Sequence, residues 1–154
     1  MEICEYLKDS HVFLDMKSRD KKEFLDELVS ILKERGIIKN DRKILEELLK
    51  REGLGSTGLE KGIAIPHALT NEVDSTVLAL AVVKDGMDFD AVDQKPTYVV
   101  LLMLGKKSNP GYQLKVLAHV CRLVKETSVV EKLRKARSAA DICKIFSGEE
   151  GKII

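Results

Sequence analysis

The length, composition and charge of the chain exclude several classes of protein. Its 154 residues suit one domain with a sizeable core, and two domains would be cramped. The formal net charge is +1, from 26 Lys and Arg against 25 Asp and Glu, which argues against a nucleic acid or an anionic membrane held by bulk charge. The N-terminus carries acids where a signal peptide carries bases, and no apolar run approaches the roughly 18 residues of a membrane span. We therefore expect a cytoplasmic protein that does not insert into a membrane.

The first half of the chain predicts one strand and two helices. Residues 11–16 form a brief apolar stretch that is typical of a short strand. Apolar residues then recur at helical spacing over 24–32, and Gly36 supplies the end of that helix. A polar residue at 40–41 caps a second helix, whose apolar face and charged exit occupy 44–53.

Two continuous apolar runs predict central strands. Residues 77–83 and 99–104 are too continuously apolar for strands with one exposed face, so helices must cover both faces of their sheet. Asp85-Gly86 is expected to end the first strand, and Pro96 introduces the second.

Three helices are predicted after these strands. Asn109-Pro110 begins the first, with asparagine as the cap and proline in the first turn. Its predicted apolar stripe comprises Leu114, Leu117, Cys121 and Val124. Ser128 and Ser138 each precede an acidic residue at the capping-box spacing, so each is expected to open a shorter helix.

The order of these elements predicts the fold. A strand, two helices, about three strands and three helices suggest an α/β protein, a three-layer α/β/α sandwich on a mixed central sheet. We expect a single domain over 1–146 and a loose polar tail over 147–154.

The three cysteines predict neither a disulfide framework nor a zinc site. Cys4, Cys121 and Cys143 are odd in number and lack C-x-x-C spacing, and two of them lie in helical patterns. We interpret all three as buried, reduced thiols.

One motif match fails on its context. Residues 53–58, Gly-Leu-Gly-Ser-Thr-Gly, satisfy the G-x-G-x-x-G pattern of dinucleotide-binding proteins. That fingerprint must follow a strand and open a helix, whereas here it follows a helical segment and precedes a strand-like run. A nicotinamide or flavin site is therefore disfavoured.

The candidate functional residue is His67. It follows a proline at the end of 62–67 (Gly-Ile-Ala-Ile-Pro-His), and a turn of glycines and hydroxyls at 55–58 precedes it. A neutral imidazole is a good nucleophile near pH 7 and carries a phosphoryl group reversibly. Phosphoryl transfer needs backbone N–H groups, hydroxyls and a guanidinium nearby. Those groups are supplied by Arg51, Ser56, Thr57 and Gly58. These residues alone leave open a second interpretation, in which His67 is a surface or capping residue.

Four segments together resemble a known family. Arg51-Glu52, 55–58, 62–67 and 89–93 (Phe-Asp-Ala-Val-Asp) are similar to the fructose/mannitol-type enzyme IIA of the bacterial phosphoenolpyruvate-dependent phosphotransferase system, which includes a nitrogen-regulatory branch. The resemblance covers about 6–146. It implies the same layered fold on a mixed sheet.

The resemblance also implies a function for His67. This residue would accept a phosphoryl group from the histidine of the small phosphocarrier HPr, or of its nitrogen-branch counterpart. In transport members the group next passes to a cysteine of a IIB domain and then to the sugar. Arg51 would lie near the phosphorylated imidazole, Ser56 and Thr57 would line the pocket, and Gly58 would support phosphate binding. The protein would need no metal and no dissociable cofactor.

The chain departs from the family at a few positions. Many transport members carry a second histidine where alignment places Gln113, and an amide donates hydrogen bonds but cannot become cationic. His119 is not a displaced substitute, because the helical wheel places it on a polar face, where we expect it to be solvated. Ala68-Leu69 replaces the glycine and basic residue that usually follow the histidine. His11 matches no functional position.

These departures leave three functional interpretations. The first is a component of sugar uptake that works through phospho-His67. The second is a regulatory protein whose phosphorylation state changes which protein it binds. The third is a pseudo-carrier that kept the fold and lost the reaction. The absence of a fused IIB or membrane domain, together with Gln113, favours regulation.

Overall fold

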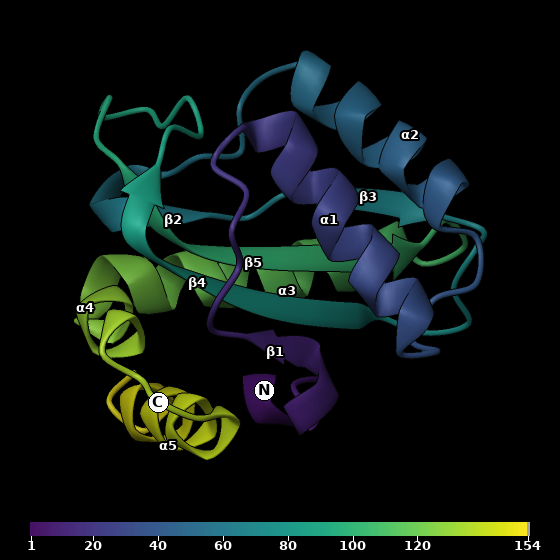
Figure 1. Cartoon of the computed structure of the whole chain (residues 1–154). Helices are drawn as coiled ribbons and strands as arrows, with labels where there is room; N and C mark the ends of the chain where they lie inside the picture. Colours follow the sequence, from purple (N-terminus) through teal and green to yellow (C-terminus); the bar gives the residue numbers. More distant parts are fainter. Residues whose placement is uncertain (154) are drawn as a thin grey trace.

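The computed structural model describes residues 1–153, and the last residue lies outside the described part. The chain forms three layers, with a mixed sheet between two groups of helices (Figure 1). This confirms the predicted α/β/α arrangement, although four strands follow the first two helices where about three were expected. The elements in chain order are η1 (Ile3–Glu5), η2 (Asp9–His11), β1 (Val12–Phe13), α1 (Lys21–Glu34), α2 (Asp41–Gly53), η3 (Glu60–Gly62), β2 (Ile63–Ala64), β3 (His67–Thr70), β4 (Val77–Met87), β5 (Thr97–Lys106), α3 (Pro110–Glu126), α4 (Val129–Arg134) and α5 (Ala139–Glu150).

The two predicted apolar strands form the centre of the sheet. β4 and β5 pair antiparallel, with Leu80 opposite Leu101. β1 runs parallel to β4 on one side, while β2 and β3 both run parallel to β5 on the other. β2 and β3 lie end to end along one edge, because Ile65 and Pro66 interrupt the ladder between them. The chain resumes its pairing at His67, opposite Met103.

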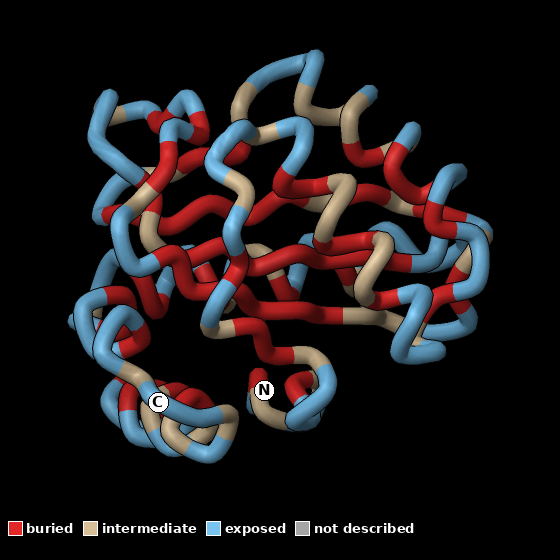
Figure 2. Tube along the Cα trace, in the orientation of Figure 1, coloured by how far each residue is buried: buried red, intermediate tan, exposed pale blue. Residues whose placement is uncertain are grey.

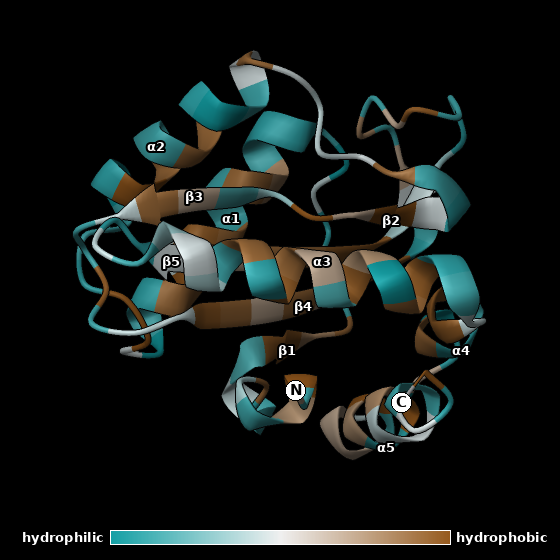
Figure 3. Ribbon diagram, turned by 180° about the vertical axis from the view of Figure 1, so that it is seen from behind, coloured by the Kyte–Doolittle hydropathy of each residue, from teal (hydrophilic) through white to brown (hydrophobic). Residues whose placement is uncertain are grey.

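Alternation along β4 and β5 sends apolar side chains to both faces of the sheet. Ala79 and Leu102 belong to the core beneath α1 and α2, whereas Leu80 and Leu101 belong to the core beneath α3, α4 and α5. Figure 2 shows the central strands buried along most of their length, and Figure 3 shows α3 running along the second face. The sheet is therefore covered on both sides, as its composition predicted.

Polar side chains begin several of the helices. The side chain of Asp20 accepts a hydrogen bond from the backbone N–H of Glu23 at the start of α1, and that of Asn40 does the same for α2. Ser138 caps α5 in the same way, as predicted. Ser128 precedes α4 but makes no side-chain cap, because Thr127 Oγ1 accepts from the backbone at the start of this helix instead.

The expected end of the first central strand is wrong. β4 continues through Asp85 and Gly86 and pairs again at Met87, opposite Thr97, after a shift in register. Gly86 has a φ of +75°, and a Cβ on it would lie 2.9 Å from the ring of Tyr98. The glycine therefore carries the strand through a bulge rather than ending it.

The apolar stripe predicted for α3 is only half correct, because Val124 is buried and Leu117 packs against the core but the other two members are exposed. Leu114 is 66% exposed and Cys121 is also exposed. The buried residues are Gln113, Val116, Val120, Leu123 and Val124. Compared with the predicted stripe, the buried face is shifted by about one residue, which is a rotation of roughly 100° around the helix. Apolar side chains occur along both faces, and the polar Gln113 made the buried face look less apolar in the sequence.

The C-terminal end of the chain packs against the N-terminal end. α5 continues through Glu150, and Ile153 is buried in the core, so residues 147–153 are not a loose tail. A disulfide joins Cys4 to Cys143 across 139 residues of sequence, which ties the N-terminal turn η1 to α5. The prediction of three buried, reduced thiols is therefore wrong: two are bonded to each other, and Cys121 is exposed.

The prediction that His119 is solvated is wrong. Its Nε2 lies 2.6 Å from Oε2 of Glu150, and the same oxygen accepts a hydrogen bond from the backbone N–H of Ile3. The helical wheel of α3 missed this contact because α5 covers the face that looked polar. His11 also has a local partner, since its Nδ1 lies 2.7 Å from the carbonyl oxygen of Leu78.

Among residues 1–153, no helix combines the length and apolar character needed to cross a bilayer.

Candidate functional site

The backbone just before His67 is held by hydrogen bonds at the interruption between β2 and β3. The carbonyl of Pro66 accepts a hydrogen bond from Met103 in β5, and the N–H of Ile65 donates to the carbonyl of Thr57. Pro66 also restricts its own φ. The two residues before His67 are therefore tied to the glycine turn and to the central strand, and His67 begins β3 opposite Met103.

A hydrogen bond fixes the tautomer of His67. Its Nδ1 lies 2.8 Å from the carbonyl oxygen of Ile65. A carbonyl oxygen only accepts, so Nδ1 must carry the proton and donate it. The lone pair then resides on Nε2, at the other end of the ring, and the side chain is only partly buried. The nitrogen that could act as a nucleophile is thereby defined.

His67 borders an open pocket of about 480 Å³ between α2, β3 and the start of α3. Three of the residues singled out in the sequence, Arg51, His67 and Gln113, are brought together here, although they lie far apart along the chain. The full lining comprises Lys43, Glu46, Glu47, Lys50, Arg51, Leu54, His67, Ala68, Leu69, Lys107 and Gln113.

The charges of this pocket leave a cationic surplus. Lys43 lies 3.7 Å from Glu46, and Lys107 lies 3.5 Å from Glu47, so these four charges form two pairs. In the described chain, Lys50 has no carboxylate within 4.0 Å. Arg51 likewise has none, and one of its guanidinium nitrogens donates to the carbonyl of Gly55 at 2.9 Å. An anion in the pocket would meet both of these cations.

Gln113 occupies the pocket wall in an unusual environment. It is 6% exposed, and its Oε1 has no hydrogen-bond partner among the described residues. The side chain packs on Gly105 so closely that a Cβ there would lie 2.3 Å from Oε1. Glycine at 105 is therefore required for this placement of Gln113, whose amide belongs to the same pocket as the imidazole.

The hydroxyls of the glycine turn are engaged with protein groups. Ser56 Oγ donates to the carbonyl of Phe89 at 2.7 Å and accepts from the N–H of Gly58 at 3.0 Å. Thr57 is buried, and both its hydroxyl and its N–H donate to Glu52. A Cβ on Gly58 would lie 2.8 Å from the carbonyl oxygen of Phe89, which explains the glycine.

The contacts of Ser56 and Gly58 bind the turn to the 89–93 segment. Ser56, Thr57 and Gly58 do not line the His67 pocket, so their expected contact with phosphate stays a prediction. Sequence reasoning missed Lys50, Leu54 and Lys107 as pocket residues. The first two adjoin Arg51 at the exit of α2, and that proximity was the only available signal.

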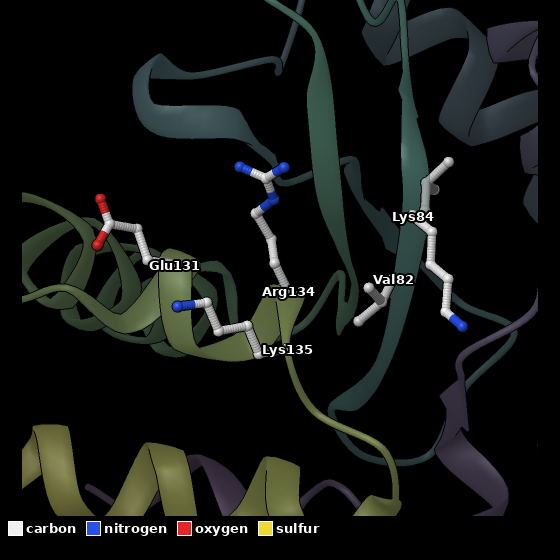
Figure 4. Close-up of a pocket in the computed structure, with 6 residues that line it drawn as sticks. Val82, Lys84, Glu131, Arg134 and Lys135 are labelled. Carbon is white, nitrogen blue, oxygen red and sulfur yellow. The ribbon is translucent and has the colours of Figure 1, made fainter.

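A second hollow, of about 440 Å³, lies between β4 and α4 (Figure 4). It carries Lys84, Arg134 and Lys135, whose side chains point in different directions in the figure. The guanidinium of Arg134 stacks over the ring of Tyr98 at 3.4 Å. The lining of this hollow includes no histidine, so we assign it no phosphoryl transfer.

Fold and pocket together define an α/β protein with a tautomer-fixed histidine beside an open pocket that carries surplus positive charge, an arrangement suited to a histidine phosphocarrier. Comparison with known families makes this class specific. Residues 5–149 match the family described as phosphoenolpyruvate-dependent sugar phosphotransferase system, EIIA 2. The chain therefore belongs to this family of phosphotransfer components, as the sequence motifs had suggested.

Both branches of the family include relatives of this chain. It is 30% identical over 147 residues to the nitrogen regulatory protein of Bradyrhizobium diazoefficiens, with 96% of this chain and 95% of the relative covered. It is also 30% identical over 147 residues to the fructose-specific EIIABC component of Bacillus subtilis. There the match covers 96% of this chain but only 23% of the relative, so the chain spans about a quarter of that protein's length.

Solved structures show the same fold. The nitrogen regulatory protein IIA-Ntr of Neisseria meningitidis superposes with a TM-score of 0.84 at 32% identity, covering 94% of this chain and 98% of that one. The mannitol IIA of Escherichia coli, in a complex with phosphorylated IIB, gives a TM-score of 0.77. Its identity is 20%, over 92% of this chain and 97% of that one, so this second likeness concerns the fold alone.

Proposed function

We propose that this protein accepts a phosphoryl group on Nε2 of His67 from HPr or its nitrogen-branch counterpart, and that its phosphorylation state changes which protein it binds. The hydrogen bond from Nδ1 to the carbonyl of Ile65 carries this proposal. It leaves the Nε2 lone pair free, beside an open pocket with surplus positive charge.

The proposed transfer needs no further base. The Nε2 lone pair of His67 attacks phosphorus, and a new P–N bond forms. The P–N bond to the donor imidazole breaks, and its electron pair returns to the donor nitrogen. Nδ1 keeps its proton, so the phosphorylated ring gains positive charge, which the carbonyl of Ile65 stabilises at 2.8 Å.

Two pocket residues are suited to the transferred oxygens. Arg51 is tied to Gly55 through one nitrogen, which orients the rest of its guanidinium at the pocket wall. The amide of Gln113 supplies a neutral donor where, by the family resemblance, many transport members carry a second histidine. Ser56, Thr57 and Gly58 support the site by holding the turn against the 89–93 segment.

The regulatory role is supported by similarity along the whole chain. The nitrogen regulatory relative is matched over nearly its full length, and a neutral Gln113 offers less charge stabilisation for rapid flux to a sugar. The alternative is transport, in which the phosphoryl group passes to a IIB cysteine. An equal identity to the fructose-specific relative favours that alternative. A non-catalytic, protein-binding pseudo-carrier is the third candidate.

Incubation with phosphoenolpyruvate, enzyme I and either carrier tests the proposal. We expect a mass gain of one phosphoryl group that is acid-labile, absent in His67→Ala and retained in the control His119→Ala. A group gained by His67→Ala would show that the site is wrong. If wild type gained nothing from either carrier, the pseudo-carrier would be the better interpretation.

A second measurement separates regulation from transport. Purified IIB domains are added to the phosphorylated protein, and the label is followed. Slow or absent loss of label supports the regulatory role, whereas rapid transfer to a IIB cysteine establishes transport.

A further inference from the structure

A buried ion pair lies behind the glycine turn, outside the lining of the His67 pocket. Lys21 is the first residue of α1 and Glu52 lies near the end of α2, and these two helices lie side by side over one face of the sheet (Figure 1). The Nζ of Lys21 lies 2.6 Å from Oε2 of Glu52, whose side chain is only 6% exposed. A carboxylate in such a place is retained only with partners, because an unpaired charge is costly away from water.

Both oxygens of the Glu52 carboxylate also accept hydrogen bonds from Thr57. The hydroxyl of Thr57 donates to Oε1, and its backbone N–H donates to Oε2 at 3.3 Å. Hydrogen bonds to a charged acceptor are stronger than those between neutral groups. Glu52 therefore anchors both the side chain and the backbone of Thr57 within the glycine turn.

Hydrogen bonds continue from Thr57 to His67. The carbonyl of Thr57 accepts from the N–H of Ile65 at 3.0 Å, and the carbonyl oxygen of Ile65 lies 2.8 Å from Nδ1 of His67. Each carbonyl remains a well-placed acceptor only while the residue that carries it stays in position. The contacts therefore run from Glu52 through Thr57 and Ile65 to the nitrogen that sets the tautomer of His67.

We propose that Glu52 is a positioning residue for phosphoryl transfer. By anchoring Thr57, it holds the carbonyl of Ile65 where that oxygen keeps the proton of His67 on Nδ1. The inference rests on the proposed function, because the tautomer affects transfer only if Nε2 of His67 is the nucleophile. Without Glu52 the carbonyl would move away from the ring, and a shift of about 1 Å breaks a hydrogen bond. The proton would then reside on either nitrogen, and fewer molecules would have a free Nε2 lone pair.

Glu149 in α5 provides a matched control. It is also a buried carboxylate, 1% exposed, and it is paired with Lys132 and Lys152. In the described chain these two lysines are the hydrogen-bond partners of its side chain, so it has no contact of this kind with the glycine turn or with β3. Loss of either carboxylate should lower stability, whereas only loss of Glu52 should change the ring of His67.

The first measurement observes the ring in the unphosphorylated protein. At about pH 9, where an ordinary imidazole is neutral, ¹⁵N chemical shifts of labelled histidine show which ring nitrogen carries the proton. We expect Nδ1 of His67 to be protonated in wild type, in Glu149→Ala and in Thr57→Ser, which keeps the hydroxyl. We expect a mixture of tautomers in Glu52→Ala and, to a smaller extent, in Thr57→Val, which keeps the shape of the side chain but loses the hydroxyl.

The second measurement connects the ring to the reaction. Each protein is phosphorylated by phosphoramidate, a small donor, and by the carrier protein that serves wild type better. We expect Glu52→Ala to react at least about tenfold more slowly with both donors, and Thr57→Val about fivefold more slowly. Thr57→Ser and Glu149→Ala should stay within about twofold of wild type. The double variant of Glu52→Ala and Thr57→Val should be within about twofold of Glu52→Ala, because both changes break the same series of contacts.

Several results would overturn the inference. A folded Glu52→Ala variant that keeps the proton on Nδ1 and reacts at the wild-type rate would do so. If Glu52→Ala does not fold, Thr57→Val decides, and an unchanged ring and rate in that variant would overturn the proposal. The same change of tautomer in Glu149→Ala would show that lost stability, rather than lost position, disturbs the ring. If wild type accepts no phosphoryl group from any donor, the proposed function fails, while the ¹⁵N shifts still decide whether Glu52 sets the tautomer of His67.

Discussion

His67 and His119 are both partly buried histidines, yet their surroundings give them opposite properties. His67 uses Nδ1 for a backbone carbonyl and leaves Nε2 beside an open pocket. His119 commits Nε2 to the carboxylate of Glu150, on a surface that α5 covers. The chemistry available to a histidine is thus decided by which nitrogen is already engaged and by what covers the other.

The two histidines mark two differently built regions. We call the His67 pocket the open region, because Lys50 and Arg51 have no carboxylate partner among the described residues and Gln113 Oε1 has no hydrogen-bond partner there. We call the contact between η1, α3 and α5 the closed region, because the Cys4–Cys143 disulfide and Glu150 tie its elements together. Changes in the open region should affect transfer, and changes in the closed region should affect stability.

The largest effect is expected at the nucleophile. His67→Gln should lower the rate of phosphorylation by the carrier by at least about a thousandfold, since no other group in the pocket replaces the Nε2 lone pair. Its thermal unfolding should stay close to that of wild type. The matched change His119→Gln should do the reverse, leaving the rate intact and lowering stability. Equal rates for the two variants would contradict the distinction between the regions.

The next effect is expected at the disulfide. Cys4→Ser should lower the free energy of unfolding by about 2–5 kcal/mol, because the cross-link closes a long loop in the unfolded chain. Urea unfolding under oxidising conditions measures this, with Cys121→Ser as the control that should change little. The phosphorylation rate of the folded protein should not change. A Cys4→Ser variant as stable as wild type would show that the bond contributes nothing in solution.

Glu150 should have a smaller effect on stability. Glu150→Ala removes the acceptor shared by His119 and the backbone of Ile3, at a position that is 4% exposed. We expect a loss of about 1–3 kcal/mol, because a buried donor is left without a partner. Glu126→Ala removes only an exposed pair with Arg122 and should cost under about 0.5 kcal/mol. Similar losses of stability in the two variants would show that the buried contacts of Glu150 contribute no more than an exposed ion pair.

Gln113 should have a modest effect on transfer. Gln113→Ala removes an amide donor from the pocket and should slow phosphorylation by about tenfold, the equivalent of one hydrogen bond. Gln113→His should restore or exceed the wild-type rate, because an imidazole can become cationic. Lys115→Ala, which changes an exposed residue on the same helix, serves as the control. An unchanged rate in Gln113→Ala would remove the amide from the proposed mechanism.

The smallest effect is expected from acid. The hydrogen bond from Lys132 lowers the pKa of Glu149 in the folded protein. A lowered folded pKa gives stability that is present above the unfolded value and is lost as the pH falls through the folded value. Unfolding midpoints should therefore hold near neutral pH and decline below about pH 4.3. Glu149→Gln should make the unfolding midpoint fall less steeply at low pH. The same acid dependence in this variant and in wild type would contradict the role given to Glu149.

Local signals predicted the frame of the fold well. The caps at Asn40 and Ser138 and the continuous apolar strands depend on neighbouring residues, which a single sequence displays. The bulge at Gly86 could not be predicted from the sequence, because a glycine at this place can end a strand or continue it, depending on what packs against it. Here Tyr98 packs there, and that contact is long-range.

Contacts between distant segments account for the remaining errors. The pairing of Cys4 with Cys143, and of His119 with Glu150, depends on where α5 folds back, which no local pattern encodes. The same limit applies to the site. His67 was found from its motif, but the surplus charge at Lys50 emerged only when the ion pairs around it were placed.

The phosphorylated atom itself provides the most direct test of the proposed chemistry. Protein with ¹⁵N-labelled histidine is phosphorylated by the carrier, and nitrogen–phosphorus coupling is measured by NMR. We predict one phosphoryl group on Nε2 of His67, with Nδ1 still protonated. A group on Nδ1 of that ring, or on His11 or His119, would contradict the proposal.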